Sequence, residues 1–212
     1  MGNQIIIIEN SNAWIEGNAV QQLETTAKLP HMQRVAGMPD LHAGRGYPVG
    51  AAFFSIGHFY PALIGNDIGC GMAFWQTNLA AHKAKTGKLV KQLGSIDAPL
   101  GEDWQARINE LLPQHPFQAA LGTIGGGNHF AELQAVDTVY APEHLPAAFH
   151  PQCLQLLVHS GSRGLGQHIL RHHVDKFNHA GLPENTPEAA AYLAEHDAAL
   201  DFARTNRRLI AE

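Results

Sequence analysis

Glycine and proline divide the segment from Val35 to Thr77 into short apolar runs, and this alternation constrains the fold more than any other feature of the chain. The runs read VAGMPD, YPVGAAFFSIG and YPALIGNDIGCGMAFW. Glycine and proline interrupt helices and favour turns, whereas apolar runs of this length are typical of strands. We therefore expect tightly packed β-structure in this part of the chain.

Helices and further strands are expected on either side of this segment. The four isoleucines at 5–8 predict a buried strand, and Asn185-Thr186-Pro187-Glu188 resembles the cap of a helix. The expected helices span 12–29, 80–93, 102–112, 164–178 and 189–212, and the expected later strands span 130–136 and 154–158. The sequence thus predicts a mixed α/β (α+β) fold, with a β-rich core and helices packed outside it.

Length and composition are those of a globular protein. A chain of 212 residues suits one large domain or two small ones, and 45% hydrophobic against 16% charged residues excludes a disordered chain. The net charge of −5 argues against nucleic-acid binding through overall charge. A local basic patch remains open, because the last quarter contains Arg163, Arg171, Arg204, Arg207 and Arg208.

The cellular location is expected to be the cytoplasm. Only two cysteines, Cys70 and Cys153, occur, and they lie far apart, which argues against a disulfide framework and for a reducing compartment. No signal-like segment or membrane-spanning run is visible, so we expect no membrane partner.

Histidine is unusually frequent, with 14 residues against 14 for lysine and arginine together. Histidine is the commonest metal ligand and a good acid–base group. Four histidines follow helical patterns and are expected to be surface or packed residues without such a role: His172, His173, His179 and His196.

The first segment with chemical potential is Asn66 to Met72, in which Asp67 and Cys70 are three residues apart. Two glycines permit a tight bend that turns the carboxylate and the thiol toward one point. A hard oxygen ligand beside a soft sulfur suits Mn²⁺, Fe²⁺ or Zn²⁺ better than Mg²⁺ or Ca²⁺. The alternative is a glycine-rich turn with a buried cysteine.

The second segment is Gly125 to Glu132, with the sequence GGGNHFAE. Three glycines can bring backbone N–H groups close to an anion. Asn128 can donate to phosphate oxygens, and His129 can bind a metal ion. The alternative is a flexible hairpin loop whose histidine faces solvent.

The third segment is His159 to Gly166, which follows an apolar strand and precedes a helix. A helix N-terminus favours anions, and Ser160, Ser162 and Arg163 add hydroxyl and guanidinium donors that match phosphate. His159, at the end of the strand, is held rigidly enough for a metal ligand. The alternative is a helix cap with an incidental arginine.

A fourth segment, Gly37 to Gly46, is similar in composition. Asp40 and His42 can support metal ligands through hydrogen bonds without contacting the ion. As loop residues, they can equally be structural.

Four motifs carry a resemblance to a known family. GMPDLHAGRGYPVGA, IGNDIGCGM, LGTIGGGNHF and VHSGSRGLG occur in the order and approximate spacing of the RtcB family of RNA ligases. The resemblance covers the chain from Pro30 to Ile210. The chain looks closest to the bacterial subgroup that is encoded beside a release-factor-like protein and linked to RNA repair.

The resemblance implies an RtcB-like fold and a specific reaction. RtcB-like ligases use GTP and Mn²⁺ to join RNA 3′-phosphate or 2′,3′-cyclic phosphate ends to 5′-hydroxyl ends, in RNA repair or tRNA splicing. A histidine attacks the α-phosphate of GTP, the GMP passes to the RNA 3′-phosphate, and the 5′-hydroxyl displaces it. The implied partners are RNA and, for this subgroup, a release-factor-like protein or the ribosome.

The resemblance also implies roles for individual residues. Two metal ions are expected, with Cys70 bridging them, and the residues that match the family's metal ligands are Asp67, Cys70, His129 and His159. Those that match the guanylate-binding segment are Asn128, His129, Phe130, Ala131 and Glu132. Those in the stretch that meets phosphate or RNA are Ser160, Ser162 and Arg163.

Family members also contain a further metal-binding histidine and an HGAGR-type motif with the guanylated histidine, and neither occurs in this sequence. We therefore expect residues 1–212 to be the N-terminal part of a single RtcB-like catalytic domain. The part is expected to be inactive alone and to leave some apolar surface uncovered. Two other function classes stay open: a metal-dependent phosphoesterase or cyclic phosphodiesterase, and a non-catalytic RNA-binding or assembly module.

Overall fold

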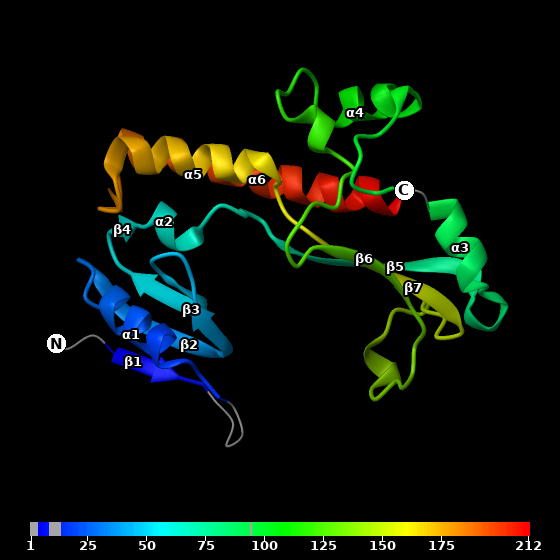
Figure 1. Ribbon diagram of the computed structural model, residues 1–212, viewed down its shortest axis with the longest axis horizontal. Helices are drawn as coiled ribbons and strands as arrows, with labels where there is room; N and C mark the ends of the chain where they lie inside the picture. The colour runs from blue at the N-terminus through cyan, green and yellow to red at the C-terminus, as the bar shows by residue number, and fades with distance from the viewer. Residues whose placement is uncertain (1–3, 9–13, 94) are drawn as a thin grey trace. The chain divides into compact units, whose positions relative to one another are not determined.

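The structure of the protein is a computed structural model that describes residues 4–8, 14–93 and 95–212 (Figure 1). The chain divides into two compact units. The first comprises residues 1–64 and 173–192, and the second comprises residues 65–172 and 193–212. That the two units form a single catalytic domain stays a prediction.

The first unit is built on a three-stranded sheet with the order β1-β2-β3. Strand β1 (Gln4–Ile7) is parallel to β2 (Met32–Ala43), and β3 (Pro48–Ser55) is antiparallel to β2. Helix α1 (Gly17–Thr26) lies against this sheet (Figure 1). Its fully buried Ala19 and Leu23 belong to the same hydrophobic core as Val35 of β2.

The first unit also contains two short strands and a short helix. Strand β4 (His58–Phe59) pairs antiparallel with β8 (Leu182–Pro183), and α2 (Pro61–Ile64) follows β4. The turn into β8 requires glycine, because Gly181 has a φ of +78° and a Cβ there would lie 2.8 Å from the ring atoms of His58 and Tyr60.

The isoleucine run does not form the buried strand that the sequence predicts. Ile5, Ile6 and Ile8 are 41%, 44% and 47% exposed. The physical reason is that β1 is an edge strand, which pairs with β2 alone among the described strands. The expected helix 12–29 is shorter than predicted, and residues 12 and 13 lie outside the described residues.

The second unit contains an antiparallel sheet with the order β5-β7-β6. Its strands are β5 (Gly71–Ala80), β7 (Cys153–Ser160) and β6 (Phe130–Gln134). In this register His159 of β7 lies between Met72 and Phe130. Met72 is 60% exposed and Phe74 is 53% exposed, so part of the apolar surface of this sheet is uncovered.

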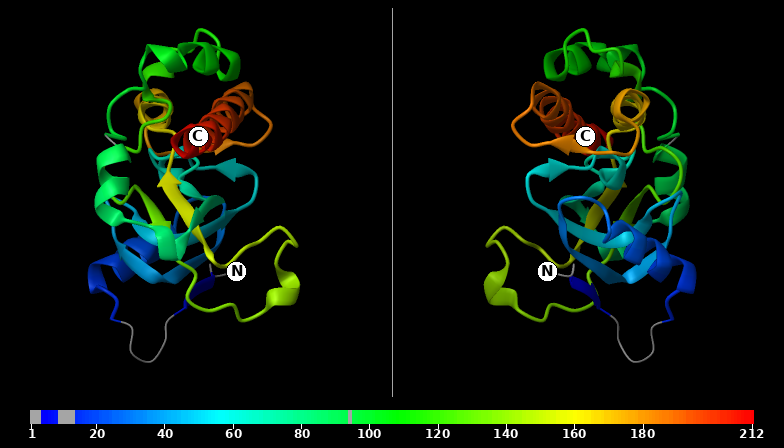
Figure 2. Two further views of the ribbon diagram at one scale, coloured as in Figure 1. Left: turned by 90° about the vertical axis from the view of Figure 1, so that its right-hand side faces the viewer. Right: turned by 90° about the vertical axis from the view of Figure 1, so that its left-hand side faces the viewer.

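Short helices connect β5 to β6. They are η1 (Ala81–Lys83), α3 (Thr86–Leu93), η2 (Glu102–Trp104), α4 (Gln105–Leu111) and η3 (Gln118–Ala120). The expected helix 80–93 is therefore interrupted, because Ala80 still pairs with Cys153 in the sheet. The segment between β6 and β7 contains only η4 (Pro142–His144) and loops away from the sheet (Figure 2).

Two long helices end the described chain, and both lie close to their predicted ranges. Helix α5 (Gly164–Phe177) follows β7 after a short loop, which confirms the predicted strand–loop–helix junction. Helix α6 (Pro187–Ala211) begins after a cap, since the Ala189 N–H donates to Thr186 Oγ1 at 3.2 Å. Pro187 occupies the first helical turn, where no N–H partner is required.

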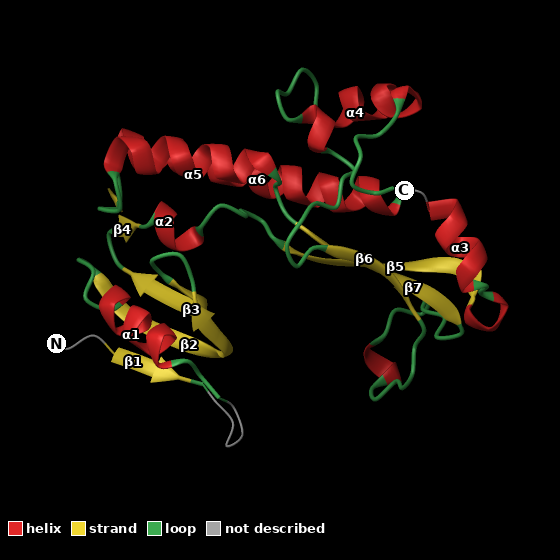
Figure 3. Ribbon diagram, in the orientation of Figure 1, coloured by secondary structure: helices red, strands yellow, loops and turns green. Residues whose placement is uncertain are grey.

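Helices make up 39% and strands 25% of the described residues, which confirms the predicted mixed α/β class (Figure 3). Among the described residues, every helix is too short or too polar to span a bilayer.

Candidate metal centre

Asp67 and Cys70 lie on a tight turn at the start of β5. The Cys70 N–H donates to the Asp67 carbonyl at 3.0 Å, which closes the turn. Gly69 has a φ of +75°, and a Cβ there would lie 2.8 Å from the Cβ of Ala203 on α6. Only glycine therefore permits both this backbone conformation and the close packing of the turn against α6.

His129 lies next to this turn, where β6 begins. Its Nε2 is 2.8 Å from Asp67 Oδ2 and 3.7 Å from Cys70 Sγ. Its Nδ1 is 3.1 Å from the Ile124 carbonyl. The Ile124 carbonyl can only accept a hydrogen bond, so we assign a proton to Nδ1. Nε2 consequently faces the carboxylate and the thiol.

His159 approaches the same thiol from β7. Its Nε2 is 3.1 Å from Cys70 Sγ. The imidazole packs edge-on against the rings of His129 and Phe130, with centroid distances of 5.5 Å and 5.4 Å. The cysteine sulfur is therefore shared by two histidines that come from neighbouring strands.

The donor set fits a divalent cation. The ligand atoms of Asp67, Cys70 and His129 all lie within 4.8 Å of one another, and the Nε2 of His159 is a fourth potential ligand atom on the Cys70 side. His129 Nε2 and Asp67 Oδ2 lie 2.8 Å apart, close enough for both to bind one cation or for the imidazole to donate to the carboxylate. The Ile124 carbonyl, which accepts from Nδ1, would keep the His129 ring in place when a cation is bound.

Electrostatics oppose a free thiolate in the metal-free protein. Partial desolvation and the neighbouring Asp67 carboxylate, which also hydrogen-bonds the thiol, raise the pKa of Cys70 to about 12, whereas the charge of Arg207 lowers it. An ion that binds at Cys70 around neutral pH must therefore displace a proton.

Gly161 makes room for Asp67. A Cβ at position 161 would lie 2.0 Å from Asp67 Oδ1 and 2.6 Å from its Cγ. The carboxylate thus rests directly against the backbone of the loop that joins β7 to α5. Any side chain at position 161 would push the Asp67 carboxylate out of place.

The glycine run and Arg163 are also in contact. Arg163 has a φ of +57°, unusual for a residue with a side chain, and its Nε donates to Thr123 Oγ1 at 3.3 Å. A Cβ on Gly125 would lie 1.4 Å from Arg163 Nη1. The guanidinium therefore lies against Gly125, in space that only glycine leaves open.

Similarity to known proteins agrees with these motifs. The model of the tRNA-splicing ligase RtcB family matches residues 22–111 and 106–212. The chain belongs to the RtcB family. The RNA-splicing ligase RtcB2 of Escherichia coli is 55% identical over 213 residues, which cover 100% of this chain and 56% of that protein.

More distant RtcB proteins match as well. The RNA-splicing ligase RtcB of Escherichia coli K12 is 31% identical over 195 residues, covering 76% of this chain and 44% of that protein. The tRNA-splicing ligase RtcB of Archaeoglobus fulgidus is 27% identical over 264 residues, covering 93% of this chain and 54% of that protein. The chain thus spans about half the length of these RtcB relatives.

The residues that the RtcB resemblance assigns to guanylate lie at the start of β6. Asn128 and Glu132 are exposed, and His129, Phe130 and Ala131 are partly buried. The ring of Phe130 contacts the ring of His159. This segment therefore lies directly beside the candidate metal ligands.

The two serines of the RtcB-like HSGSRG motif are less accessible than phosphate binding suggests. Ser160 is fully buried, and its Oγ donates to the Ile124 carbonyl at 2.9 Å. Ser162 is also fully buried, and its Oγ has no hydrogen-bond partner among the described residues. Within this motif Arg163, which is partly buried, is the more accessible donor.

Asp40 and His42 lie on β2 of the first unit, where both are exposed. The Nδ1 of His42 is 2.7 Å from the Asp40 carbonyl. The hypothesis that they support the metal ligands stays a prediction.

Two residues beside the candidate metal ligands lie in no recognisable motif and were not expected from the sequence. Asn206 and Arg207 of α6 are 0% and 9% exposed and form hydrogen bonds with the segments that carry the candidate ligands. Arg207 is therefore not part of a basic surface patch. Nearby Arg204 and Arg208 are exposed but pair with Asp201 and Glu212.

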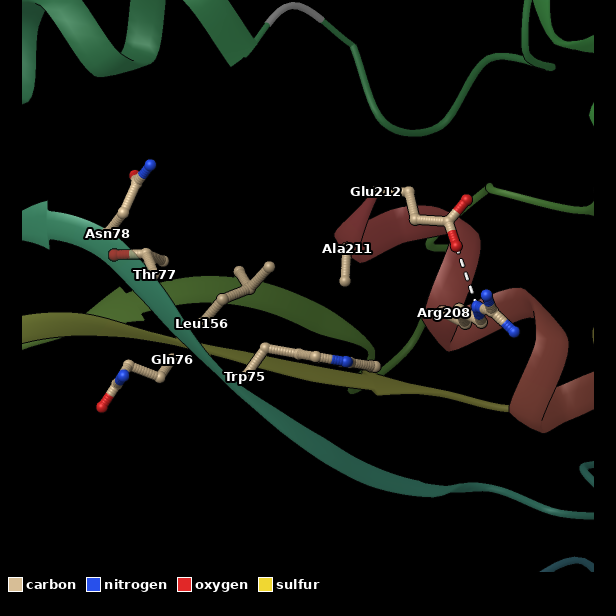
Figure 4. Close-up of a pocket in the computed structure, with 8 residues that line it drawn as sticks. All are labelled: Trp75, Gln76, Thr77, Asn78, Leu156, Arg208, Ala211 and Glu212. Carbon is tan, nitrogen blue, oxygen red and sulfur yellow. Dashed lines mark hydrogen bonds and ion pairs between the residues drawn. The ribbon is translucent and has the colours of Figure 1, made fainter. Parts of the chain in front are cut away.

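A pocket of about 430 Å³ lies elsewhere in the second unit, where β5 and β7 meet the end of α6 (Figure 4). Trp75, Leu156 and Arg208 line it, and Arg208 pairs with Glu212. None of the four candidate metal ligands lines this pocket, so it is distinct from the metal centre.

Proposed function

We propose that this chain forms the metal-binding part of an RNA ligase. The ligase would join RNA 3′-phosphate or 2′,3′-cyclic phosphate ends to 5′-hydroxyl ends through a GMP-activated RNA end. One observation carries the proposal: Cys70 Sγ lies between two histidine Nε2 atoms, at 3.1 Å and 3.7 Å, beside the Asp67 carboxylate. The names of the relatives, which are RNA-splicing and tRNA-splicing ligases, support RNA as the substrate class.

The proposed cofactors are GTP and two Mn²⁺ ions, with Cys70 shared between the ions. Asp67, Cys70, His129 and His159 would hold them. A set of carboxylate, thiolate and imidazole ligands favours a transition-metal ion such as Mn²⁺ over Mg²⁺. When bound, divalent ions neutralise phosphate charge and orient the reacting groups.

The chain's own residues would bind and orient the phosphates. We propose that the segment from Asn128 to Glu132 contacts the guanylate and that Arg163 presents its planar guanidinium to phosphate oxygens. Arg163 directly precedes α5, whose N-terminus favours anions. The buried Ser162 Oγ, without a partner among the described residues, is a further group that a phosphate oxygen or a water molecule would satisfy.

We further propose a domain organisation, a cellular location and a partner. The two units are proposed to act as one catalytic domain. Both cysteines are free, which favours a reducing compartment and hence the cytoplasm. A release-factor-like protein or the ribosome as a partner rests on the sequence resemblance alone. The guanylated histidine is proposed to lie outside these 212 residues, so the chain is expected to bind Mn²⁺ without sealing RNA by itself.

An RNA-end assay separates the function classes. The protein is incubated with a labelled RNA bearing a 2′,3′-cyclic phosphate and a 5′-hydroxyl RNA, with Mn²⁺, and with or without GTP. We expect Mn²⁺-dependent binding of the phosphate-ended RNA and no joined product. A 3′-phosphate product that forms without GTP would establish a phosphoesterase instead. Absence of Mn²⁺ binding would favour a non-catalytic module.

Mn²⁺ binding is expected to strengthen about tenfold per pH unit between pH 7 and 8.5. The pKa of the Cys70 thiol in the metal-free protein is raised to about 12, so the thiol is protonated throughout this range. Rising pH removes the proton that competes with the ion, and falling pH restores it. Calorimetric titrations at several pH values measure the slope. A pH-independent affinity, or the same slope in Cys70→Ala, would contradict this origin.

Replacing Gly125 with alanine is expected to weaken binding of a 3′-phosphorylated oligonucleotide about tenfold, the effect of losing one charge-assisted hydrogen bond. The added Cβ would displace the Arg163 guanidinium, which it would meet at 1.4 Å. Fluorescence anisotropy in the presence of Mn²⁺ measures the affinity.

Gly127→Ala is the matched control for this substitution. Gly127 has a φ of +80° against +86° for Gly125, so both variants carry similar backbone strain, but nothing lies within 4 Å of a Cβ at Gly127. Equal losses of affinity in the two variants would show that strain, and not Arg163, is responsible.

A further inference from the structure

We propose that Asn206 and Arg207 of α6 are positioning residues that hold together the three chain segments carrying the candidate metal ligands. The inference rests on the metal site proposed above and adds two residues to it. These segments are the Asp67–Cys70 turn, the loop before His129, and the end of β7 at His159.

Arg207 joins two of these segments through one nitrogen. Its Nη1 donates to the Gly69 carbonyl at 2.8 Å and to the Ser160 carbonyl at 2.6 Å. Gly69 directly precedes Cys70, and Ser160 directly follows His159. Each accepted bond is therefore one residue from a candidate ligand, and together they fix the spacing between the backbones of Cys70 and His159.

Asn206 adds the third segment. Its Oδ1 accepts from the Gly122 N–H at 2.8 Å, and its Nδ2 donates to the Thr123 carbonyl and to Ser160 Oγ, both at 3.0 Å. The side chain makes these three bonds while fully buried. It thus anchors the base of the glycine loop to the end of β7.

The network continues to the ring of His129. Ser160 Oγ donates to the Ile124 carbonyl at 2.9 Å, and the same carbonyl accepts from His129 Nδ1 at 3.1 Å. Asn206 therefore reaches a candidate ligand through Ser160 and Ile124. Groups that orient metal-binding histidines in this way contribute strongly to metal affinity.

Burial distinguishes this pair from ordinary helix-surface residues. Desolvation lowers the pKa of Arg207, which indicates that burying the charged guanidinium costs free energy. The side chains of Arg204 and Arg208, on the same helix, are 69% and 57% exposed and pair only with nearby acidic residues. A buried guanidinium directed at backbone carbonyls beside two ligands fits a positioning role.

The test uses substitutions for which charge and positioning predict opposite effects. Arg207→Gln and Asn206→Asp each change the local charge by one negative unit, so electrostatics alone predicts tighter binding of a cation. Loss of positioning predicts weaker binding. We expect each variant to raise the dissociation constant for Mn²⁺ about tenfold. Titration calorimetry measures the constants, and Arg208→Gln, with the same charge change at an exposed position, is expected to bind as the wild type does.

A Co²⁺ spectrum separates positioning from general stability. The thiolate-to-Co²⁺ absorption is expected to weaken in both variants. Arg207→Lys, which keeps the charge and one hydrogen bond, replaces a variant that fails to fold. It is expected to bind Mn²⁺ with an affinity between those of the wild type and Arg207→Gln. Wild-type Mn²⁺ affinity and an unchanged Co²⁺ spectrum in the folded variants would overturn the inference, even if their melting temperatures fall. A wild-type protein that binds no Mn²⁺ would instead overturn the proposed function.

Discussion

Replacing Cys70 with serine is expected to lower the affinity for Mn²⁺ by about two orders of magnitude or more while the protein stays folded. Cys70 Sγ is the atom that both histidine Nε2 atoms approach, so it is the centre of the proposed site. Serine has nearly the same volume but lacks the soft sulfur that ionises readily to a thiolate ligand. Titration calorimetry with Mn²⁺ and circular dichroism measure the two properties separately.

Cys153→Ser is the matched control for the Cys70 substitution. Cys153 is the other free cysteine and lies at the opposite end of β7, paired with Ala80. We expect this variant to bind Mn²⁺ with wild-type affinity. Equal affinities for wild type and Cys70→Ser, together with a loss of stability in Cys70→Ser, would mean that Cys70 is structural.

Replacing Gly161 with alanine is expected to weaken Mn²⁺ binding at least about tenfold, the size of effect seen when groups that orient metal ligands are lost. The added Cβ would lie 2.0 Å from Asp67 Oδ1, a distance that no contact tolerates, so the carboxylate must leave its position beside His129. Binding is measured by calorimetry, and the fold is checked by thermal unfolding.

Gly126→Ala separates this steric effect from a general effect of alanine. Nothing lies within 4 Å of a Cβ at Gly126, so this variant is expected to keep the wild-type affinity. If Gly161→Ala also keeps it, the Asp67 carboxylate does not contribute to the metal site.

Local signals predict part of the fold well. The Thr186–Pro187 cap and the junction between β7 and α5 depend on neighbouring residues, and the structure contains both. The environment of β1 depends instead on which elements lie next to it. The run of isoleucines in the sequence therefore predicts a buried strand, whereas in the structure these residues lie in an exposed edge strand. The interruption of the expected helix 80–93 likewise follows from a long-range pair, Ala80 with Cys153.

The candidate ligands can be predicted from the sequence because each lies in a short motif of glycines and polar residues. The residues that hold these motifs together cannot be predicted in this way. The bond from Arg207 to Gly69 joins positions 138 apart, and those from α6 to Ser160 join positions 46 and 47 apart. An arginine on a helix is usually solvated, so no pattern in the sequence separates Arg207 from Arg208.

Anomalous diffraction from a crystal soaked in Mn²⁺, recorded at the manganese absorption edge, tests the metal site most directly. The proposed function predicts an anomalous peak within bonding distance of Cys70 Sγ, Asp67 and His129, and a second on the His159 side of the same sulfur. A map with no peak at Cys70, or with peaks only at other places on the protein, would contradict it.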